Sequence, residues 1–324
     1  MIYIGFLLLA AVTVISAVKL SGYAEVIQLR TGMTGFFVGA VLVAGATSLP
    51  EVTTSVTSGL IRSPDLAVGN VLGSNLFNLF ILAVLDLWFR KKRMYVHISD
   101  KSFMPGLLGL LLAIIVAVAF LIQSSANVFG VGLDSLFIVA FYFGGLYYLN
   151  KKDKLPDEPV SEKEVQMSLK AGITRFAIAA LLILAAGSFL TIIGDQIAIQ
   201  TGLGQSFVGS LLIAGATSLP EVSVVYLALK RNQFNAALGV VLGSNMFNLI
   251  LLAVADGFYR DAVLLRDASQ INWISIAALI LLTTVVLIGT WKNQKIKRFT
   301  WLPSLLVVIG YTATMIMLYL FGSI

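Results

Sequence analysis

Long apolar segments separated by short polar connectors fill this chain of 324 residues. An apolar run of about 20 residues can cross ~30 Å of hydrocarbon as an α-helix, and runs of this length favour helix over strand. The pattern therefore predicts an all-α integral membrane protein with ten transmembrane helices. We expect these helices at 2–18, 34–60, 65–87, 103–122, 128–149, 171–193, 205–230, 235–257, 270–290 and 299–322.

The composition supports a membrane protein. Hydrophobic residues make up 58% of the chain and charged residues 12%, with a mean hydropathy of +0.95. Such values are far from those of water-soluble domains. The chain has no cysteine, which excludes disulfides and zinc–thiolate sites. Its net charge of +6 does not indicate a nucleic-acid partner, because the basic residues gather in alternate connectors between apolar segments.

The basic residues predict the orientation in the lipid bilayer. One set of connectors holds most of them: Lys19, Arg30, Arg90, Lys91, Lys92, Arg93, Lys101, Lys151, Lys152, Lys154, Lys163, Lys170, Lys230, Arg231, Lys292, Lys295, Lys297 and Arg298. The opposite set holds Arg62, Arg260 and Arg266. Basic connectors face the cytosol, so both termini are predicted outside and the linker 150–170 inside. The compactness of the chain favours the plasma membrane of a prokaryote.

Two segments of the chain repeat at an offset of 170 residues. Gly45–Glu51 and Gly215–Glu221 both read GATSLPE, and Gly69–Asp86 is identical to Gly239–Asp256 at 13 of 18 positions. The chain is thus predicted to consist of two related halves, 1–149 and 171–324, joined by a linker. Five spans per half is an odd number, so the second half must be inverted in the membrane. Inverted repeats are typical of secondary transporters, whose binding site lies at the repeat interface near the midplane.

The proline of each GATSLPE segment predicts a broken helix. Pro50 lacks an amide hydrogen, and its ring clashes with the carbonyl four residues earlier. Backbone carbonyls near Ala44–Ala46 would then be free of helical partners. Lipid cannot satisfy them, whereas a dehydrated cation can. Pro220 predicts the same for Ala214–Ala216.

Oxygen-bearing side chains surround a carboxylate in each half. Thr47 and Ser48 lie one helical turn from Glu51, and Ser74 and Asn78 share a helix face. The second half repeats this set as Thr217, Ser218, Glu221, Ser244 and Asn248. A carboxylate at mid-membrane costs roughly 2.5–3.5 kcal/mol, and bearing this cost twice indicates a shared function. Oxygen ligands with two negative charges suit hard cations such as Ca2+. The two asparagines could instead form helix-packing hydrogen bonds.

The paired GATSLPE and GSNxFN segments resemble the alpha repeats of the cation/calcium antiporter superfamily, most closely its sodium/calcium exchanger branch. The resemblance covers the whole chain. It implies that Glu51 and Glu221 bind Ca2+, while hydroxyls and freed carbonyls help to bind Na+. It implies hydroxyl ligands at Thr47, Ser48, Ser74, Thr217, Ser218 and Ser244, and carbonyl donors at Ala44 and Ala214. Some members carry Asp in place of Asn78 or Asn248, and its absence here speaks against an additional protonatable site or a potassium-dependent variant.

These observations predict a secondary antiporter that exports Ca2+ in exchange for Na+ by alternating access. An H+/Ca2+ antiporter using the same glutamates is the alternative, because a buried glutamate can itself titrate. The proton-coupled branch typically has a glutamate motif beginning Gly-Asn, which this chain lacks. An ion channel is disfavoured, since channels usually build a pore from subunits around an axis.

Enzymatic activity is not expected. An intramembrane enzyme would need a nucleophile–base pair or an aspartate dyad in the membrane. The predicted spans place Ser and Thr next to Glu but no His or Lys at depth. We therefore predict no cofactor other than the transported ions, Ca2+ and Na+ or H+, and we expect a monomer to suffice for transport.

Overall fold

The computed structural model describes residues 2–31, 47–99, 103–152, 167–259, 262–293 and 300–322. The described chain is helical apart from one short antiparallel hairpin, β1 (Asn127–Val128) and β2 (Val131–Gly132). The predicted all-α fold is therefore confirmed. In chain order the helices are α1 (Ile2–Thr31), α3 (Leu49–Leu60), α4 (Pro64–Trp88), η1 (Arg90–Lys92), α5 (Met94–His97), α6 (Phe103–Ile122), α7 (Leu133–Lys152), α8 (Leu169–Thr201), α9 (Gln205–Val208), η3 (Gly209–Ile213), α10 (Ala214–Thr217), α11 (Leu219–Lys230), α12 (Phe234–Phe258), α13 (Leu264–Asp267), α14 (Asn272–Asn293) and α15 (Leu302–Phe321).

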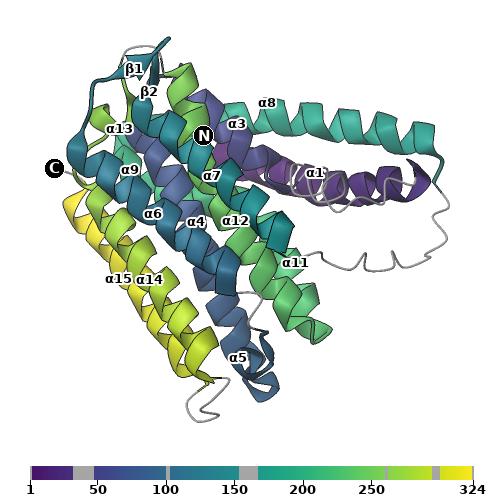
Figure 1. The fold of residues 1–324 in the computed structure, drawn as a ribbon. Helices are drawn as coiled ribbons and strands as arrows, with labels where there is room; N and C mark the ends of the chain where they lie inside the picture. Colours follow the sequence, from purple (N-terminus) through teal and green to yellow (C-terminus); the bar gives the residue numbers. More distant parts are fainter. Residues whose placement is uncertain are drawn as a thin grey trace.

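Two central helices, α4 and α12, organise the bundle. The apolar stretch of α4 is 72% buried and that of α12 is 61% buried. The helices α3, α6, α11, α14 and α15 surround them (Figure 1). Both helices carry buried amide and carboxyl side chains, and polar groups within membrane helices face the interior of a bundle, which explains why these two occupy its centre.

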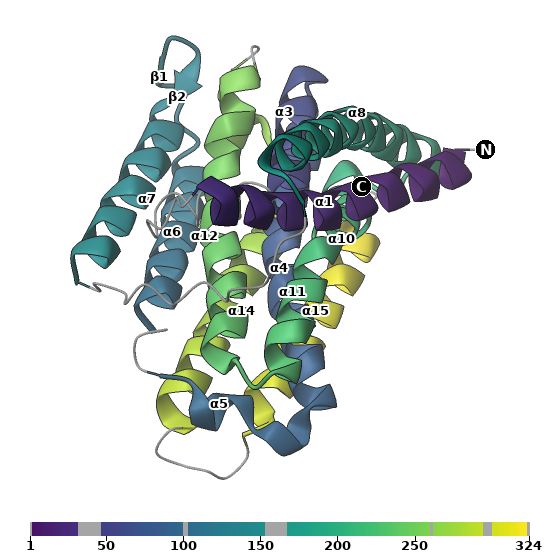
Figure 2. The ribbon, with the colours of Figure 1, turned by 90° about the vertical axis from the view of Figure 1, so that its right-hand side faces the viewer.

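The two longest helices, α1 and α8, form a pair of their own. They pack together along their length and lie across the side of the bundle (Figures 1 and 2). Arg30, near the end of α1, donates from Nε to the carbonyl of Met167, next to the start of α8, at 3.1 Å. Gly5, near the start of α1, faces Ile193 in the later part of α8. The pair is therefore antiparallel.

The first predicted span, 2–18, is too short. The helix α1 continues to Thr31, so Lys19 and Arg30 lie within it and not in a connector. Both side chains are exposed, as is Glu25. Lysine and arginine are good helix formers, and charges that face outward do not interrupt a helix. The helix α8 likewise runs past the predicted end at 193 to Thr201, where Gly202 at φ 69° ends it.

Seven described helices are long and apolar enough to cross a membrane, and a bent pair, Gln205–Thr217 with Leu219–Lys230, makes an eighth. The predicted span 128–149 begins in the β-hairpin, and its apolar helix is the shorter Leu133–Leu149. The predicted span 34–60 lies partly outside the described residues. The spans at 34–60 and 128–149, and with them the total of ten, therefore remain a prediction.

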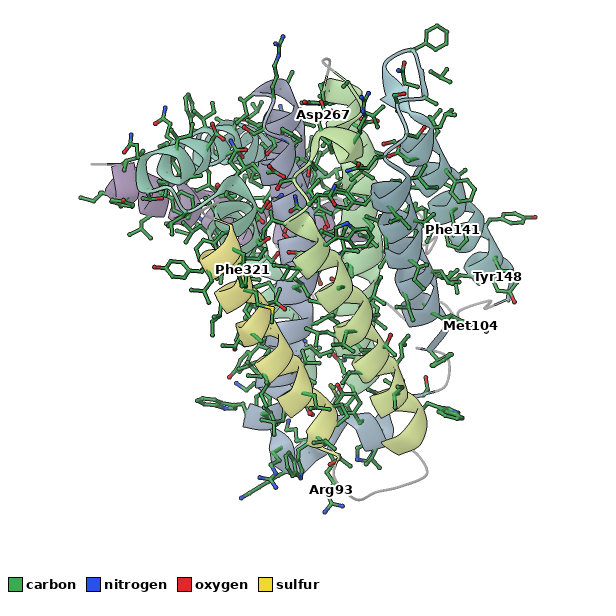
Figure 3. The ribbon with its side chains drawn as sticks, turned by 90° about the vertical axis from the view of Figure 1, so that its left-hand side faces the viewer. Arg93, Met104, Phe141, Tyr148, Asp267 and Phe321 are labelled. Atoms are coloured by element: carbon green, nitrogen blue, oxygen red, sulfur yellow. The ribbon has the colours of Figure 1, made fainter. Side chains whose placement is uncertain are left out.

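Equivalent elements of the two halves have matching bounds. The helices α11 and α12 begin and end 170 residues after α3 and α4, respectively. Figure 3 places Arg93, which follows α4, and Asp267, at the end of the loop helix that follows α12, at opposite ends of the bundle. The helices α4 and α12 therefore run in opposite directions, as inverted halves require.

Candidate ion-binding site

The helix that carries Glu221 is broken at the predicted proline. The segments on either side of Ser218 are bent by 53°, and Pro220 lies in the first turn of α11. Proline is tolerated there because its missing N–H would have no helical partner. Ser218 has φ −88° and ψ 4°, and Ser48, before α3, has φ −92° and ψ 6°. The two motifs thus share one local backbone conformation.

A π-helical turn, Gly209–Ile213, precedes this break. Such turns frequently occur at functional sites. The turn packs on α4, where a Cβ on Gly73 would collide with the backbone of Ser210. The hydroxyl of Ser210 donates to the carbonyl of Gly69 at 2.9 Å. Gly69 and Gly73 of α4 thus permit a close backbone approach, whereas the equivalent Gly239 and Gly243 have no described atom within 4 Å of their Cβ positions.

The two glutamates lie at the starts of α3 and α11, with exposures of 2% for Glu51 and 4% for Glu221. The hydroxyl of Ser218 donates to Oε1 of Glu51 at 3.3 Å, and Thr217 interacts with the same carboxylate. Glu51 and Glu221 are also close enough to interact electrostatically. The structure thus brings the GATSLPE motifs of both halves to one place in the interior.

Several buried oxygens of the predicted ligand set lack hydrogen-bond partners. The Oε2 atoms of Glu51 and Glu221 are buried and accept no hydrogen bond from the described chain, and the same holds for Ser74 Oγ and Asn248 Oδ1. A buried polar atom without a partner costs about 1–3 kcal/mol, and a charged one costs more. A cation coordinated by these oxygens would remove the cost. The donor set therefore fits a hard ion as substrate.

Comparison with known proteins identifies the family. The sequence profile described as sodium/calcium exchanger protein matches residues 1–149 and 171–320. This chain belongs to the sodium/calcium exchanger family. A relative from Methanosarcina acetivorans, sodium/calcium exchanger MaX1, is 23% identical over 362 aligned residues, covering 98% of this chain and 99% of that one.

Solved structures share the fold of this exchanger-family chain. The sodium-calcium exchanger NCX_Mj superposes with a TM-score of 0.61 at 22% identity, covering 98% of this chain and 99% of that one. The H+/Ca2+ exchanger CAX superposes with a TM-score of 0.73 at 13% identity, covering 99% and 86%. The resemblance seen in the motifs is thereby confirmed at the level of the family and its fold.

Asparagines join the centres of α4 and α12 in this member of the family. Asn75 Nδ2 donates to the carbonyl of Asn245 at 3.2 Å, and Asn245 Nδ2 donates to the carbonyl of Asn75 at 3.1 Å. Asn78 Nδ2 donates to Asn245 Oδ1 at 3.1 Å, so the amide of Asn78 takes part in helix packing. Sequence reasoning does not single out Asn75 and Asn245. The signal available was their identity in both repeats.

The other predicted site residues are placed as follows. Ser48 is buried, and Thr47 and Ser244 are half-buried. The expectation of a free carbonyl at Ala214 is wrong, because it accepts from the backbone N–H of Ser218 at 3.0 Å and from the Thr217 hydroxyl at 3.3 Å. Pro220 removes the helical donor of the residue four positions earlier, Ala216, and leaves that of Ala214 in place. Ala44 lies outside the described residues. The roles of these residues as ion ligands remain predictions.

The candidate site combines two carboxylates with neutral oxygens. Nowhere in the described ranges do three or more His, Asp or Glu side chains gather as a metal cluster. Calcium accepts six to eight oxygen ligands, among them carboxylates, amide and backbone carbonyls. Two carboxylates neutralise one divalent ion, and the neutral oxygens nearby can complete its coordination.

Proposed function

We propose that this protein exports Ca2+ in exchange for Na+ by alternating access, with Glu51 and Glu221 as ligands common to both ions. The observation that carries the proposal is the meeting of the two buried carboxylates, each with one unpartnered oxygen. One Ca2+ neutralises the pair, and monovalent ions can take its place. Because both ions use the same oxygens, the binding of one displaces the other.

The pair α1 and α8 is proposed to move against the bundle. Glycines of α8 form part of its contact with the bundle: Gly187 packs on Thr53 and Gly194 on Ile213. Because glycine has no side chain to interlock with its neighbours, such contacts permit α8 to slide. An occupied site is neutral and allows the motion. An empty site carries two like charges in the interior and resists it, so binding selects the state that moves.

The proposal includes the orientation of the protein. The end of the bundle that carries Arg90–Arg93 faces the cytosol by the positive-inside rule, and the end near Asp267 faces outward (Figure 3). The helix α3 then leads from the site to the outside, and α11 leads from the site to the cytosol. The antiparallel α4 and α12 support a complete inverted repeat of ten helices, with both termini outside a prokaryotic plasma membrane.

Flux measurements test this function. The purified protein is reconstituted in liposomes loaded with Na+, and uptake of 45Ca2+ is followed after dilution into Na+-free buffer. We expect uptake that requires the outward Na+ gradient and disappears in Glu221→Gln. Uptake that follows a proton gradient without Na+ would instead assign H+/Ca2+ exchange. Uptake retained in the variant would contradict the role of the glutamate.

A further inference from the structure

The outer part of α3 differs from its counterpart in the second half. Beyond Glu51, this helix buries five hydroxyl-bearing side chains: Thr53, Thr54, Ser55, Thr57 and Ser58. The equivalent residues of α11 are Ser223, Val224, Val225, Leu227 and Ala228, so a hydroxyl is kept at one position of the five. Asn70 of α4 is likewise replaced by Val240 in α12. Polar groups therefore line one half of the molecule at places where the other half is apolar.

Three of these side chains carry an oxygen without a hydrogen-bond partner in the described chain. The hydroxyl of Thr53 donates to the carbonyl of Leu49 at 2.8 Å, as hydroxyls in helices usually do. By contrast, Ser55 Oγ, Ser58 Oγ and Asn70 Oδ1 are fully buried and have no hydrogen-bond partner within the part of the chain that the structure describes. Unpaired oxygens of this kind are rare in interiors and need an explanation.

Two of the unpartnered oxygens lie on the face of α3 that carries Glu51. Glu51, Ser55 and Ser58 share one face of α3, because they are spaced four and three residues apart. Thr54, on the edge of this face, accepts a hydrogen bond from Asn70 Nδ2 at 2.7 Å, which joins α3 to α4.

On its other side the face is closed by α12. Gly59 shares the face with Ser55, and a Cβ there would lie 2.5 Å from the carbonyl of Ala255. On α4, Ser74 lies one turn beyond Asn70 and also has an unpartnered hydroxyl. The face of α3 that begins at Glu51 thus carries two unpartnered hydroxyls, packs against α12 at Gly59 and is joined to α4 through Thr54 and Asn70.

We propose that Ser55, Ser58 and Asn70 form an additional binding position for a monovalent cation, Na+, between Glu51 and the outer end of α3. Affinity for divalent cations depends on the number of carboxylate ligands, and this position has none. Neutral hydroxyl and amide oxygens suit an ion of single charge. The position exists on one side only, because Val225, Ala228 and Val240 stand at the equivalent places. The proposal rests on the proposed function, which supplies Na+ and the outward orientation of α3.

The test transfers the second half's residues into the first. The variant Ser55→Val/Ser58→Ala/Asn70→Val is compared with a control, Thr53→Ser. This control also replaces a residue of α3 by its counterpart in α11, Ser223, but at a position that faces α8. Na+-dependent Ca2+ flux is measured in liposomes against external Na+ concentration, and equilibrium binding of 45Ca2+ is measured without Na+. In the triple variant we expect the half-saturating external Na+ to rise about tenfold, as loss of ligands to an ion predicts.

The same variant should bind Ca2+ as the wild type does, and Thr53→Ser should change neither quantity. Ca2+ binding also reports that the triple variant is folded, and Ser58→Ala provides a milder change with a smaller shift in the same direction. An unchanged Na+ dependence would overturn the additional position, as would a parallel loss of Ca2+ binding. Wild-type flux that is independent of Na+ would instead overturn the proposed function, and the Na+ position with it.

Discussion

Asn75 and Asn245, at equivalent places in the two halves, exchange hydrogen bonds between side chain and backbone. Each amide donates to the other residue's carbonyl, at 3.2 and 3.1 Å. A reciprocal contact between equivalent residues is what a local two-fold relationship produces. It holds α4 against α12 at their centres, and these helices flank the breaks that carry Glu51 and Glu221.

Replacing Asn75 or Asn245 should lower the stability of the protein by different amounts. Asn245 also accepts a hydrogen bond from Asn78, whereas Asn75 Oδ1 has no partner in the described residues. We expect Asn245→Ala to lower the free energy of unfolding by more than Asn75→Ala, with about 1–3 kcal/mol for each buried group left unpaired. Thermal unfolding in detergent measures both, and a larger effect of Asn75→Ala would contradict the assignment.

Two equivalent glycines provide a matched test of packing. A Cβ on Gly73 would overlap the backbone of Ser210, whereas no described atom lies within 4 Å of the Cβ position of Gly243. We expect Gly73→Ala to destabilise the protein by about 1–3 kcal/mol, the usual cost of overpacking. Gly243→Ala should be tolerated. Melting temperatures of the two purified variants measure this difference, and we expect the lower one for Gly73→Ala. Equal melting temperatures would refute the close contact on α4.

The hydroxyl of Ser218 should contribute to Ca2+ affinity. It donates to Glu51 Oε1 and so orients a carboxylate that is otherwise unpaired at its second oxygen. Hydrogen bonds to charged groups are worth about 1.5–3 kcal/mol, so Ser218→Ala should weaken Ca2+ binding by roughly tenfold or more. Calorimetric titration measures the change. Ser304→Ala is the control, because its hydroxyl bonds to Asp86 instead, and a similar loss in both variants would count against a local role of Ser218.

Helix boundaries are best predicted from the sequence where a proline or a change in the repeat marks them. Proline and the repeat fix the starts of α3 and α11, and the observed bounds of α4 lie within one residue of the predicted span. The end of α1 could not be predicted from hydropathy, because Lys19 ends the apolar run without ending the helix. The start of α7 was also missed, since the residues at 128–132 are as apolar as a helix but form a hairpin.

Part of the candidate site could likewise be predicted from the sequence, and part depends on packing. The repeat indicated that Glu51 and Glu221 belong together, and the contact of Ser218 with Glu51 joins the two motifs as that expectation requires. The direction of the Asn78 amide and the pairing of Asn75 with Asn245 depend on how α4 packs against α12. Periodicity places a residue on a helix face but does not specify which neighbour it meets. The unpaired state of Ser55 and Ser58 is likewise a property of tertiary packing.

We propose above that Glu51 and Glu221 hold a single Ca2+ together. Equilibrium binding of 45Ca2+ to the purified protein, to Glu51→Gln and to Glu221→Gln tests it most directly, with circular dichroism and melting curves to show that the variants are folded. We expect one bound Ca2+ per wild-type chain and loss of that binding in both variants. A folded variant that still binds Ca2+ with wild-type affinity would contradict it.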